Sequence, residues 1–265
     1  MSYHPNPMLL LQKGPSAGTQ SFRRTVQLLR ELARVGEQGA GAGELAERCE
    51  LTRATAYRLL GALADEGLVV HAPGVRRYFL GPFAYEMGLR AFPRLGLREL
   101  CAGTVSQLAE KTGECVFLVM RSGLDTVCLD RQSGAYAVEA MPVDIGSRRP
   151  LGVGLSSIAI LGALPESERE AIMRANGMRY RETGLLAAER IRLMVKRTAR
   201  DRFAFTASDY IDNVGGFALP IRNPVDGVAF AALSIASGVQ RMRPPRSKEI
   251  VPLLESAVHT IESRL

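Results

Sequence analysis

Several features that define common protein classes are absent from this 265-residue chain. No run of about 18 apolar residues occurs, so we expect no membrane-spanning helix. The stretch 8–11 is too short for a secretory signal peptide and lacks a basic flank. The four cysteines form no CxxC pair and lie in periodic apolar segments, which predicts buried free thiols in a reducing compartment and argues against a disulfide framework or zinc site. We therefore expect a cytoplasmic protein.

The parts of a catalytic centre are also scarce. The three histidines are His4, His71 and His259, and none is placed as a general base beside a serine. The segment 154–158 has Ile158 where a nucleophile elbow needs its second glycine. The sequence has no glycine-rich phosphate loop and no acidic or histidine cluster with metal-ligand spacing. We expect no enzyme activity, no cofactor and no metal.

What remains is the composition of a soluble globular protein. Hydrophobic residues make up 46% and charged residues 23%, which allows a sizeable core, and the length accommodates one large or two ordinary domains. The formal net charge of +7 suits a polyanionic partner without proving one. Most of the cations are arginines, a bias that reflects genome composition as well as function.

The segment 44–80 has the pattern of a winged helix-turn-helix. A short amphipathic helix over 44–49 precedes a break, and Thr52 is a good N-cap for a helix over 53–66. Gly67 ends that second helix. Two β-rich runs, 68–70 and 78–80, flank a Pro-Gly turn and predict a hairpin. The second helix buries one face, which consists of Ala56, Leu59, Leu60 and Leu63.

This arrangement favours duplex DNA as the partner. A helix fits the major groove, and its first residues meet the base edges. Arginines near a hairpin tip suit phosphate or minor-groove contacts. The alternative is a pair of packed helices with a solvated arginine face. The predicted DNA-binding residues are Thr52, Arg53, Ala54, Thr55, Tyr57, Arg58, Arg76 and Arg77.

The segments around this motif suggest a tail and a linker. Residues 1–19 are rich in proline and glycine and are predicted to be disordered. Ser21 is predicted to cap a helix that ends near Val35. After the hairpin, the helix over 83–92 carries large apolar side chains, which favours dimerisation over packing on its own domain. Pro93 marks the boundary. The first helix is expected to bury Val26, Leu29, Leu32 and Ala33.

Beyond Pro93 helical and strand patterns are mixed. A polar loop is predicted over 144–150. The mixture predicts an α+β domain in which helices pack on one antiparallel sheet. The expected helices are 95–112, 152–164, 166–175, 186–202 and 247–264, and the expected strands are 115–120, 126–131, 136–142, 203–207, 214–222 and 228–236.

Three stretches together resemble the IclR-type bacterial transcriptional regulators. The first is the second helix of the helix-turn-helix with its wing, from Tyr57-Arg58-Leu59-Leu60 through Gly67-Leu68-Val69 to Tyr78-Phe79-Leu80-Gly81. The second, Ile145-Gly146-Ser147-Arg148-Arg149-Pro150-Leu151, is similar to the family's VG-x-R-x-PL segment and is followed by Leu164-Pro165. The third is 213–236. The likeness runs in order over about residues 20–265.

The resemblance implies a winged helix-turn-helix domain over 20–82, a linker helix over 83–92, and an effector-binding and oligomerisation domain of profilin-like or GAF-like form over 93–265. It also implies a homodimer or homotetramer that binds operator DNA and responds to a small-molecule effector. Family positions place the effector pocket at Val138, Met141, Arg149, Leu155, Ser156, Thr206, Val214, Gly216, Ser234 and Ala236.

The sequence departs from the family pattern at the expected pocket. The helix predicted after Gly152 has no lysine, Thr206 stands where an acidic residue is common, and Ala236 replaces a second serine. These changes predict a pocket that is less acidic and less polar than the family average.

The pocket chemistry favours a small organic or aromatic acid. The start of that helix offers free N–H groups suited to a carboxylate, and Arg148 and Arg149 are placed to reinforce it. Two simpler roles stay open: Ser156 as a helix cap, and the arginines as a solvated loop. The alternative function is an enzyme or small-molecule-binding protein with a vestigial DNA module.

Overall fold

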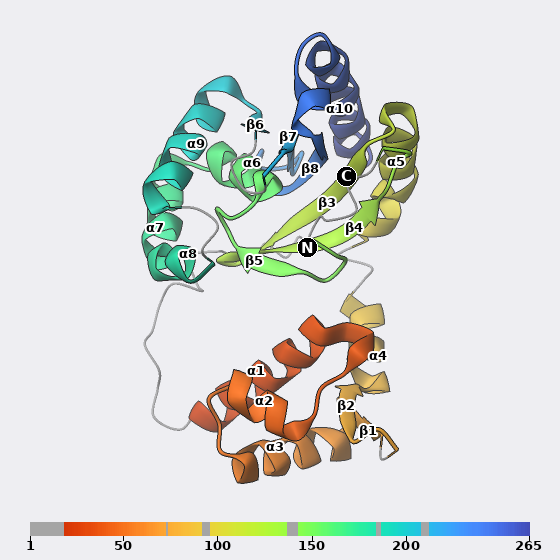
Figure 1. Ribbon diagram of the computed structural model, residues 1–265, viewed down its shortest axis with the longest axis vertical. Coiled ribbons are helices and arrows are strands. Elements are labelled where there is room, and N and C mark those ends of the chain that lie inside the picture. The colour runs from red at the N-terminus through yellow and green to blue at the C-terminus, as the bar shows by residue number, and fades with distance from the viewer. Residues whose placement is uncertain (1–18, 73, 92–95, 137–142, 184–186, 208–211) are drawn as a thin grey trace. The chain divides into compact units, whose positions relative to one another are not determined.

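The structure is a computed structural model that describes residues 19–72, 74–91, 96–136, 143–183, 187–207 and 212–265 (Figure 1). The chain divides into two compact units, Met1–Gly96 and Leu97–Leu265. The expected tail over 1–18 and the expected boundary at Pro93 lie outside the described residues, so the four-part domain division stays a prediction. Each unit is described by itself below.

The N-terminal unit is a helix-turn-helix followed by a hairpin, as predicted. The helices pack on one core, to which Leu28, Leu45 and Leu60 contribute fully buried side chains. The two strands pair antiparallel, from Val69 opposite Leu80 to Ala72 opposite Arg77. The elements are α1 Gln20–Val35, η2 Gly36–Gln38, α2 Ala42–Arg48, α3 Arg53–Asp65, β1 Val69–Ala72, β2 Arg77–Leu80 and α4 Pro82–Ala91.

The first helix differs from the prediction at its start and in its buried face. It begins at Gln20 after an N-cap at Thr19 that makes no side-chain cap bond, so Ser21 is not the cap. The buried residues are Leu28 and Leu32, and Ala33 is exposed. Leu28 and Leu32 lie one helical turn apart, so the buried stripe is centred one position before the predicted one.

The boundaries of α3 follow local signals. The Thr52 side chain accepts a hydrogen bond from the backbone N–H of Thr55 at 3.2 Å, as an N-cap should. At the other end Gly67 adopts φ +69°, a left-handed conformation that glycine accommodates without strain. Only glycine fits at position 81, directly after the hairpin, because a Cβ there would lie 2.2 Å from the carbonyl oxygen of Gly67.

The C-terminal unit is an α+β domain built on one antiparallel sheet, as predicted. Its six described strands have the order β5-β4-β3-β8-β7-β6, and every neighbouring pair is antiparallel. The elements are α5 Leu97–Thr112, β3 Cys115–Ser122, β4 Asp125–Gln132, β5 Arg148–Pro150, α6 Leu155–Ala163, α7 Glu166–Ala175, α8 Gly177–Thr183, α9 Ala188–Asp201, β6 Ala204–Ala207, β7 Val214–Arg222, β8 Ala229–Gly238, η4 Val239–Met242 and α10 Arg246–Glu262.

Two expectations for this unit are wrong, and one helix was missed. The predicted polar loop ends in the short strand β5, which pairs with residues 125–127 of β4. Helix α6 begins at Leu155, three residues after the predicted start at Gly152. Helix α8 was not predicted, because it is short and follows α7 after a single residue. The predicted strand over 136–142 lies outside the described residues except for Tyr136, which is in a turn.

The two faces of the sheet carry different layers (Figure 1). Alternate residues of a strand point to opposite faces. Val116 on β3 and Leu233 on β8 pack with α5 and α10, whereas Ala232 on β8 packs with α6 and α9. In the first half of β3, Phe117 and its neighbours on this second face form a smaller cluster. That part of the sheet carries the candidate site of the unit.

All four cysteines are buried free thiols, as predicted. Burial raises the pKa of Cys101 and of Cys128 to about 12 and that of Cys49 to about 11. These thiols are therefore protonated near neutral pH. Within the described part of the chain, no helix is long and apolar enough to cross a membrane.

Candidate DNA-binding surface and effector cavity

Helix α3 presents the predicted face to solvent. Arg53, Ala54 and Arg58 are exposed, and Tyr57 exposes 57% of its surface. Thr55 is half-buried, and its hydroxyl lies 2.8 Å from that of Thr52, so both threonines are engaged at the N-cap. The exposed arginine and tyrosine side chains lie on the first two turns, the part of a recognition helix that meets base edges.

Arg76 and Arg77 differ in their contacts. Arg77 donates from Nη1 to the carbonyl oxygens of Gly39 at 2.9 Å and Gln38 at 3.3 Å, and it lies 3.8 Å from the Glu44 carboxylate. Arg76 is exposed beside the turn and has φ +52°. Within the described part of the chain Arg76 makes no hydrogen bond or ion pair, so its guanidinium is available to a phosphate.

Ion pairing separates the arginines of this unit into two groups. Arg48 on α2 pairs with Glu44 at 2.6 Å, and Arg34 on α1 pairs with Glu31 at 3.1 Å. Arg53 and Arg58 on α3 have no such carboxylate partner among the described residues. The positive charge on the exposed face of α3 is therefore not neutralised within the unit, which favours a polyanionic partner.

A cavity of about 90 Å³ lies on the second face of the C-terminal sheet, at the start of α6. This volume is several times the roughly 10–15 Å³ that one water molecule needs. Five predicted effector-binding residues line it: Arg149, Leu155, Ser156, Ser234 and Ala236. Nine lining residues were not predicted, and they are Phe117, Val119, Thr126, Cys128, Val143, Ser147, Val153, Gly154 and Ser157.

Of the other predicted pocket residues, those that the structure describes lie beside the cavity and do not line it, and Val214 packs in the same apolar cluster as Phe117, Val119, Cys128 and Ala236. Thr206 on β6 pairs with Gly216 on β7, and neither they nor Val214 line the cavity. Gly216 lies against Leu155, one of the residues that line the cavity, since a Cβ at position 216 would lie 3.0 Å from the Leu155 side chain. Val138 and Met141 fall outside the described residues. Thr206 is not among the lining residues, and its role in effector binding stays a prediction.

The start of α6 joins the helix to the sheet through two serines. Gly154 is the N-cap and contributes no side-chain cap bond, so the helix-cap role considered for Ser156 is excluded. Ser156 Oγ donates to Ser234 Oγ on β8 at 2.7 Å. Ser157 Oγ accepts the N–H of Gly152 at 2.6 Å, which holds the turn before the helix. The two hydroxyls that meet at the cavity come from segments 78 residues apart.

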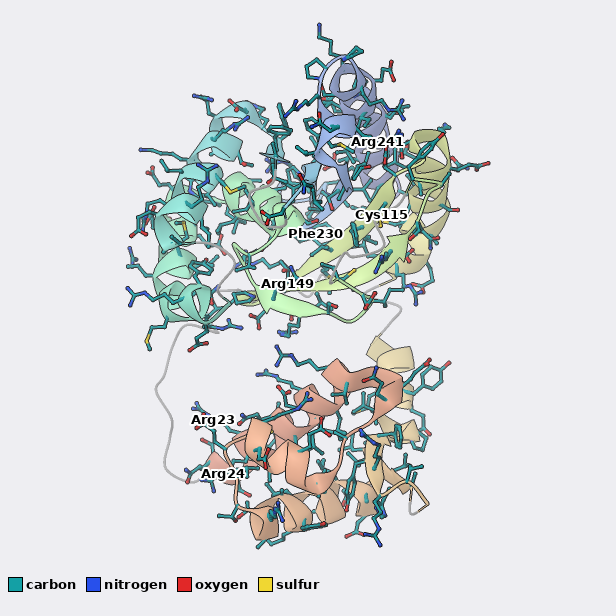
Figure 2. All side chains as sticks on the ribbon, in the orientation of Figure 1. Arg23, Arg24, Cys115, Arg149, Phe230 and Arg241 are labelled. Carbon is teal, nitrogen blue, oxygen red and sulfur yellow. The ribbon has the colours of Figure 1, made fainter. Side chains whose placement is uncertain are left out.

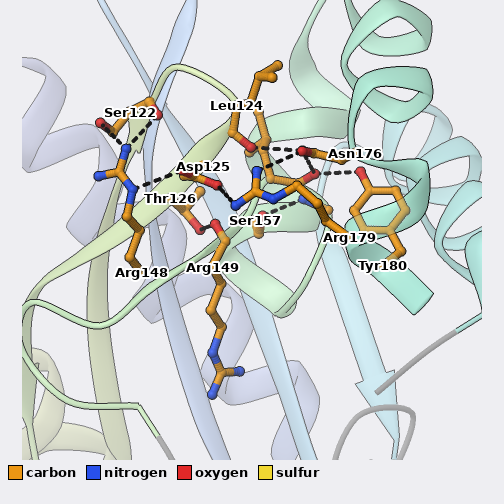
Figure 3. Close-up of polar contacts among 12 residues, drawn as sticks. Ser122, Leu124, Asp125, Thr126, Arg148, Arg149, Ser157, Asn176, Arg179 and Tyr180 are labelled. Atoms are coloured by element: carbon orange, nitrogen blue, oxygen red, sulfur yellow. Dashed lines mark hydrogen bonds and ion pairs between the residues drawn. The ribbon is translucent and has the colours of Figure 1, made fainter. Parts of the chain in front are cut away.

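Arg148 and Arg149 point to opposite sides of β5 (Figure 3). Arg148 donates from Nε to Asp125 at 2.9 Å and from Nη2 to the Ser122 hydroxyl at 3.0 Å. Arg149 lines the cavity, and its burial lowers the pKa of its guanidinium. Because alternate residues of a strand point to opposite faces, Arg149 lines the cavity and Arg148 pairs with Asp125. The structure therefore gives no support to the expected role of Arg148 in binding the ligand.

Asn176, between α7 and α8, and Tyr180 on α8 hold the turn that leads to α6 (Figure 3). Asn176 is fully buried and donates from Nδ2 to the carbonyl oxygens of Leu124 at 2.8 Å and Leu151 at 3.2 Å. The Tyr180 hydroxyl donates to Leu151 O at 2.6 Å. A Cβ at Gly152 would lie 2.5 Å from that hydroxyl, so only glycine fits.

The residues that line the cavity combine one cationic side chain with several apolar ones. Phe117, Val119 and Leu155 supply apolar surface, and Arg149 supplies the positive charge. Cys128 adds a protonated thiol. The fourteen lining residues include no Asp or Glu. The cavity therefore suits a small molecule with an apolar body and an anionic group.

Comparison with known proteins gives two domain matches. Residues 89–263 match the family model for the bacterial transcriptional regulator IclR C-terminal domain. Residues 21–73 match the model for the IclR helix-turn-helix domain. The first match alone covers more than half of the chain, and the two together include α3 and the whole cavity.

Individual relatives align over most of the chain. The probable transcriptional regulator SauR of Cupriavidus necator is 24% identical over 244 residues, which cover 91% of this chain and 94% of that protein. The transcriptional repressor IclR of Escherichia coli is 22% identical and is covered to 90%, with 93% of this chain aligned.

Solved structures share the fold. An IclR homologue from Microbacterium hydrocarbonoxydans, in complex with 4-hydroxybenzoate, superposes with a TM-score of 0.74 at 22% identity and covers 93% of this chain and 99% of its own. A regulator from a Silicibacter species gives a TM-score of 0.75 at 22% identity, over 92% of this chain and 95% of its own.

Proposed function

The chain belongs to the IclR family of bacterial transcriptional regulators, and we propose that it reads operator DNA through α3 and binds a small organic or aromatic acid in the cavity at α6. DNA-binding transcriptional regulation follows from the family. The residue roles and the effector class are proposals. The observations that carry them are the exposed arginines of α3, Arg53 and Arg58, and the half-buried Arg149 in a cavity whose lining residues include no Asp or Glu.

In the DNA-binding unit, the exposed groups have separate roles. Arg53, Ala54, Tyr57 and Arg58 face the major groove, where guanidinium and hydroxyl groups meet base edges or phosphates. Thr52 and Thr55 fix the helix start through their mutual contact. Arg76 binds phosphate beside the groove, while Arg77 holds the hairpin against residues 38–39.

The Arg76→Ala variant is expected to lower the slope of log affinity against log salt by about 1, because one guanidinium–phosphate contact is lost. The change should be equal on specific and random duplexes. Titration of a fluorescent duplex at several salt concentrations measures it. Arg77→Ala is the matched control: it should leave the slope near that of the wild type but lower the melting temperature. Equal slope changes in both variants would contradict this division of roles.

The cavity suits a carboxylate bound at the start of α6. Arg149 supplies a partly desolvated guanidinium, whose charge-assisted bonds to a carboxylate are strong. Because Ser156 donates its proton to Ser234 Oγ, the hydroxyl hydrogen of Ser234 is available to a ligand. Phe117 and Val119 contact the apolar body. The solved relative that holds 4-hydroxybenzoate supports an aromatic acid as the first compound to test.

The Ser234→Ala variant is expected to weaken effector binding by roughly 1.5–3 kcal/mol, because a hydrogen bond to a charged group is lost. Ser156→Ala should have a smaller effect, since its hydroxyl acts through Ser234. A thermal-shift screen of small carboxylic and aromatic acids, starting with 4-hydroxybenzoate, identifies the ligand, and calorimetry then compares the variants.

Affinity of both variants for DNA in the absence of effector is the control, because the serines lie in the other unit. Unchanged effector affinity together with a lower melting temperature would show that the serine pair only joins α6 to the sheet.

The assembly is proposed to be a homodimer or homotetramer acting on DNA in the cytoplasm. Phe83, Tyr85 and Met87 on α4 expose between 43% and 69% of their surfaces, a large apolar fraction for one short helix. Pairing of two copies would cover these side chains and hold two half-sites at fixed spacing. We propose no catalytic step, and the Ser156 hydroxyl is engaged with Ser234.

A further inference from the structure

The strand β5, which carries Arg149, has few backbone contacts to hold it. It is three residues long and lies at the edge of the sheet, where its only partner among the described strands is β4. Its last residue, Pro150, has no N–H to donate to the ladder. Arg149 is half-buried at the cavity, and the cost of taking a guanidinium out of water favours any movement that returns it to solvent (Figure 2). The position of β5 therefore depends on side-chain contacts as well.

Asp125 on β4 supplies such contacts. Its carboxylate accepts a hydrogen bond from Arg148 Nε at 2.9 Å and lies 2.5 Å from Arg179 Nη2 of α8, so one carboxylate is paired with two guanidinium groups (Figure 3). The Asp125 side chain is only 14% exposed, which strengthens both pairs relative to pairs on the open surface. Asp125 does not line the cavity, so any effect that it has on the effector is exerted through other residues.

The two partners of this carboxylate secure β5 at both of its ends. Arg148 is the first residue of β5 and directly precedes Arg149. At the other end, Arg179 donates from Nη1 to Asn176 Oδ1 at 2.9 Å, and Asn176 Nδ2 donates to the carbonyl oxygen of Leu151 at 3.2 Å. Leu151 directly follows β5. Arg149 is thus held between two positions that are connected through the same carboxylate.

We propose that Asp125 is a positioning residue for effector binding, which holds β5 and the Arg149 guanidinium at the cavity wall through Arg148 and Arg179. This inference rests on the proposed role of Arg149 in binding a carboxylate. Neutralising Asp125 leaves two guanidinium groups close together without an anion between them, and their repulsion moves β5 away from α8. Arg149 then loses the alignment that a charge-assisted hydrogen bond to the effector requires.

A double-mutant cycle with 4-hydroxybenzoate as the probe, measured by calorimetry on the full-length protein, tests the proposal. Arg149→Ala is expected to weaken binding by at least about tenfold, because a hydrogen bond to a charged group is lost. Asp125→Asn is expected to weaken it by roughly tenfold. Because Asp125 acts through Arg149, adding Asp125→Asn to Arg149→Ala should weaken binding by less than about twofold more. A general structural role would instead give a second loss as large as the first.

Asp201→Asn is the matched control for the loss of a carboxylate that is paired with two arginines. Asp201 lies 3.5 Å from Arg197 Nε and 2.7 Å from Arg200 Nε, and it does not line the cavity. This variant should keep the affinity of the wild type for 4-hydroxybenzoate.

Hydrogen exchange of the unliganded protein tests the position of β5 without any effector. The Cys128 N–H donates to the carbonyl oxygen of Ser147 at 3.0 Å, and the Leu151 N–H donates to that of Leu124 at 2.8 Å, so these two amides report on the contact between β4 and the chain on either side of β5. In Asp125→Asn both should exchange about tenfold faster, while the amides of β7 keep their rates.

Three results would overturn the role of Asp125 alone. They are an unchanged affinity in Asp125→Asn while Arg149→Ala weakens binding, a full second loss in the double variant, and unchanged exchange of the two reporter amides. A fourth result, unchanged affinity in Arg149→Ala, would refute the proposed function of Arg149 and the positioning role with it. The failure of the inference is therefore distinguishable from the failure of the function on which it rests.

Discussion

The Arg58→Ala variant is expected to bind the specific operator more weakly by about 1–3 kcal/mol, roughly 5- to 150-fold. Arg58 is exposed on the second turn of α3 and has no carboxylate partner among the described residues. We propose that the Arg58 guanidinium donates hydrogen bonds to a base edge, and alanine would leave those base atoms without partners. The measurement is a titration of the variant with operator and with a random duplex of equal length.

The two duplexes separate the possible roles of Arg58. Loss of a base contact lowers affinity for the operator much more than for random DNA, whereas loss of a phosphate contact lowers both equally. Arg48→Ala is the matched control, because Arg48 lies on α2 of the same unit and is paired with Glu44 at 2.6 Å. An equal loss of affinity for both duplexes would contradict base recognition by Arg58.

The Asn176→Ala variant is expected to lose about 2–5 kcal/mol of unfolding free energy. The change removes two hydrogen bonds of a fully buried amide, and it leaves the carbonyl oxygens of Leu124 and Leu151 with fewer donors. Tyr180 still donates to Leu151, which limits the loss at that carbonyl. Urea unfolding followed by circular dichroism measures the difference.

The same variant should also disturb the effector cavity. Leu151 precedes Gly152, whose N–H donates to Ser157 Oγ at the start of α6, so movement of this turn shifts the cavity wall. Asn223→Ala is the control, because the side chain of Asn223 accepts only an exposed turn N–H from Val225 and should cost less than about 1 kcal/mol. Equal losses in the two variants would refute a special role for Asn176.

The DNA-binding unit was largely predictable because its signals are local. The N-cap at Thr52, the buried stripe through Leu59 and Leu63, and the left-handed Gly67 all act within a few residues of one another. Helix period, capping and turn chemistry are properties of short segments, so the sequence alone determined α3 and its exposed face. It also determined the alternating strands, and with them the α+β class of the second unit.

The cavity was only partly predictable, because its walls come from distant segments. Ser156 and Ser234 were predicted as separate pocket residues, but their mutual hydrogen bond depends on how α6 packs on β8. Phe117 and Cys128 were missed, since an apolar residue of a strand looks the same in sequence whether it faces a helix layer or a cavity. The cavity is therefore defined by which part of the sheet α6 covers.

Two pairs of neighbouring arginines show the same difference between what local sequence predicts and what tertiary contacts decide. The sequence placed Arg76 and Arg77 near a hairpin tip and Arg148 and Arg149 in a polar loop. Only the tertiary structure decided that Arg77 binds the carbonyl groups of residues 38–39 and that Arg148 binds Asp125, leaving Arg76 and Arg149 to face outward and into the cavity. The physical reason is that each partner is brought near by strand pairing or helix packing, and sequence periodicity carries no record of contacts between distant segments.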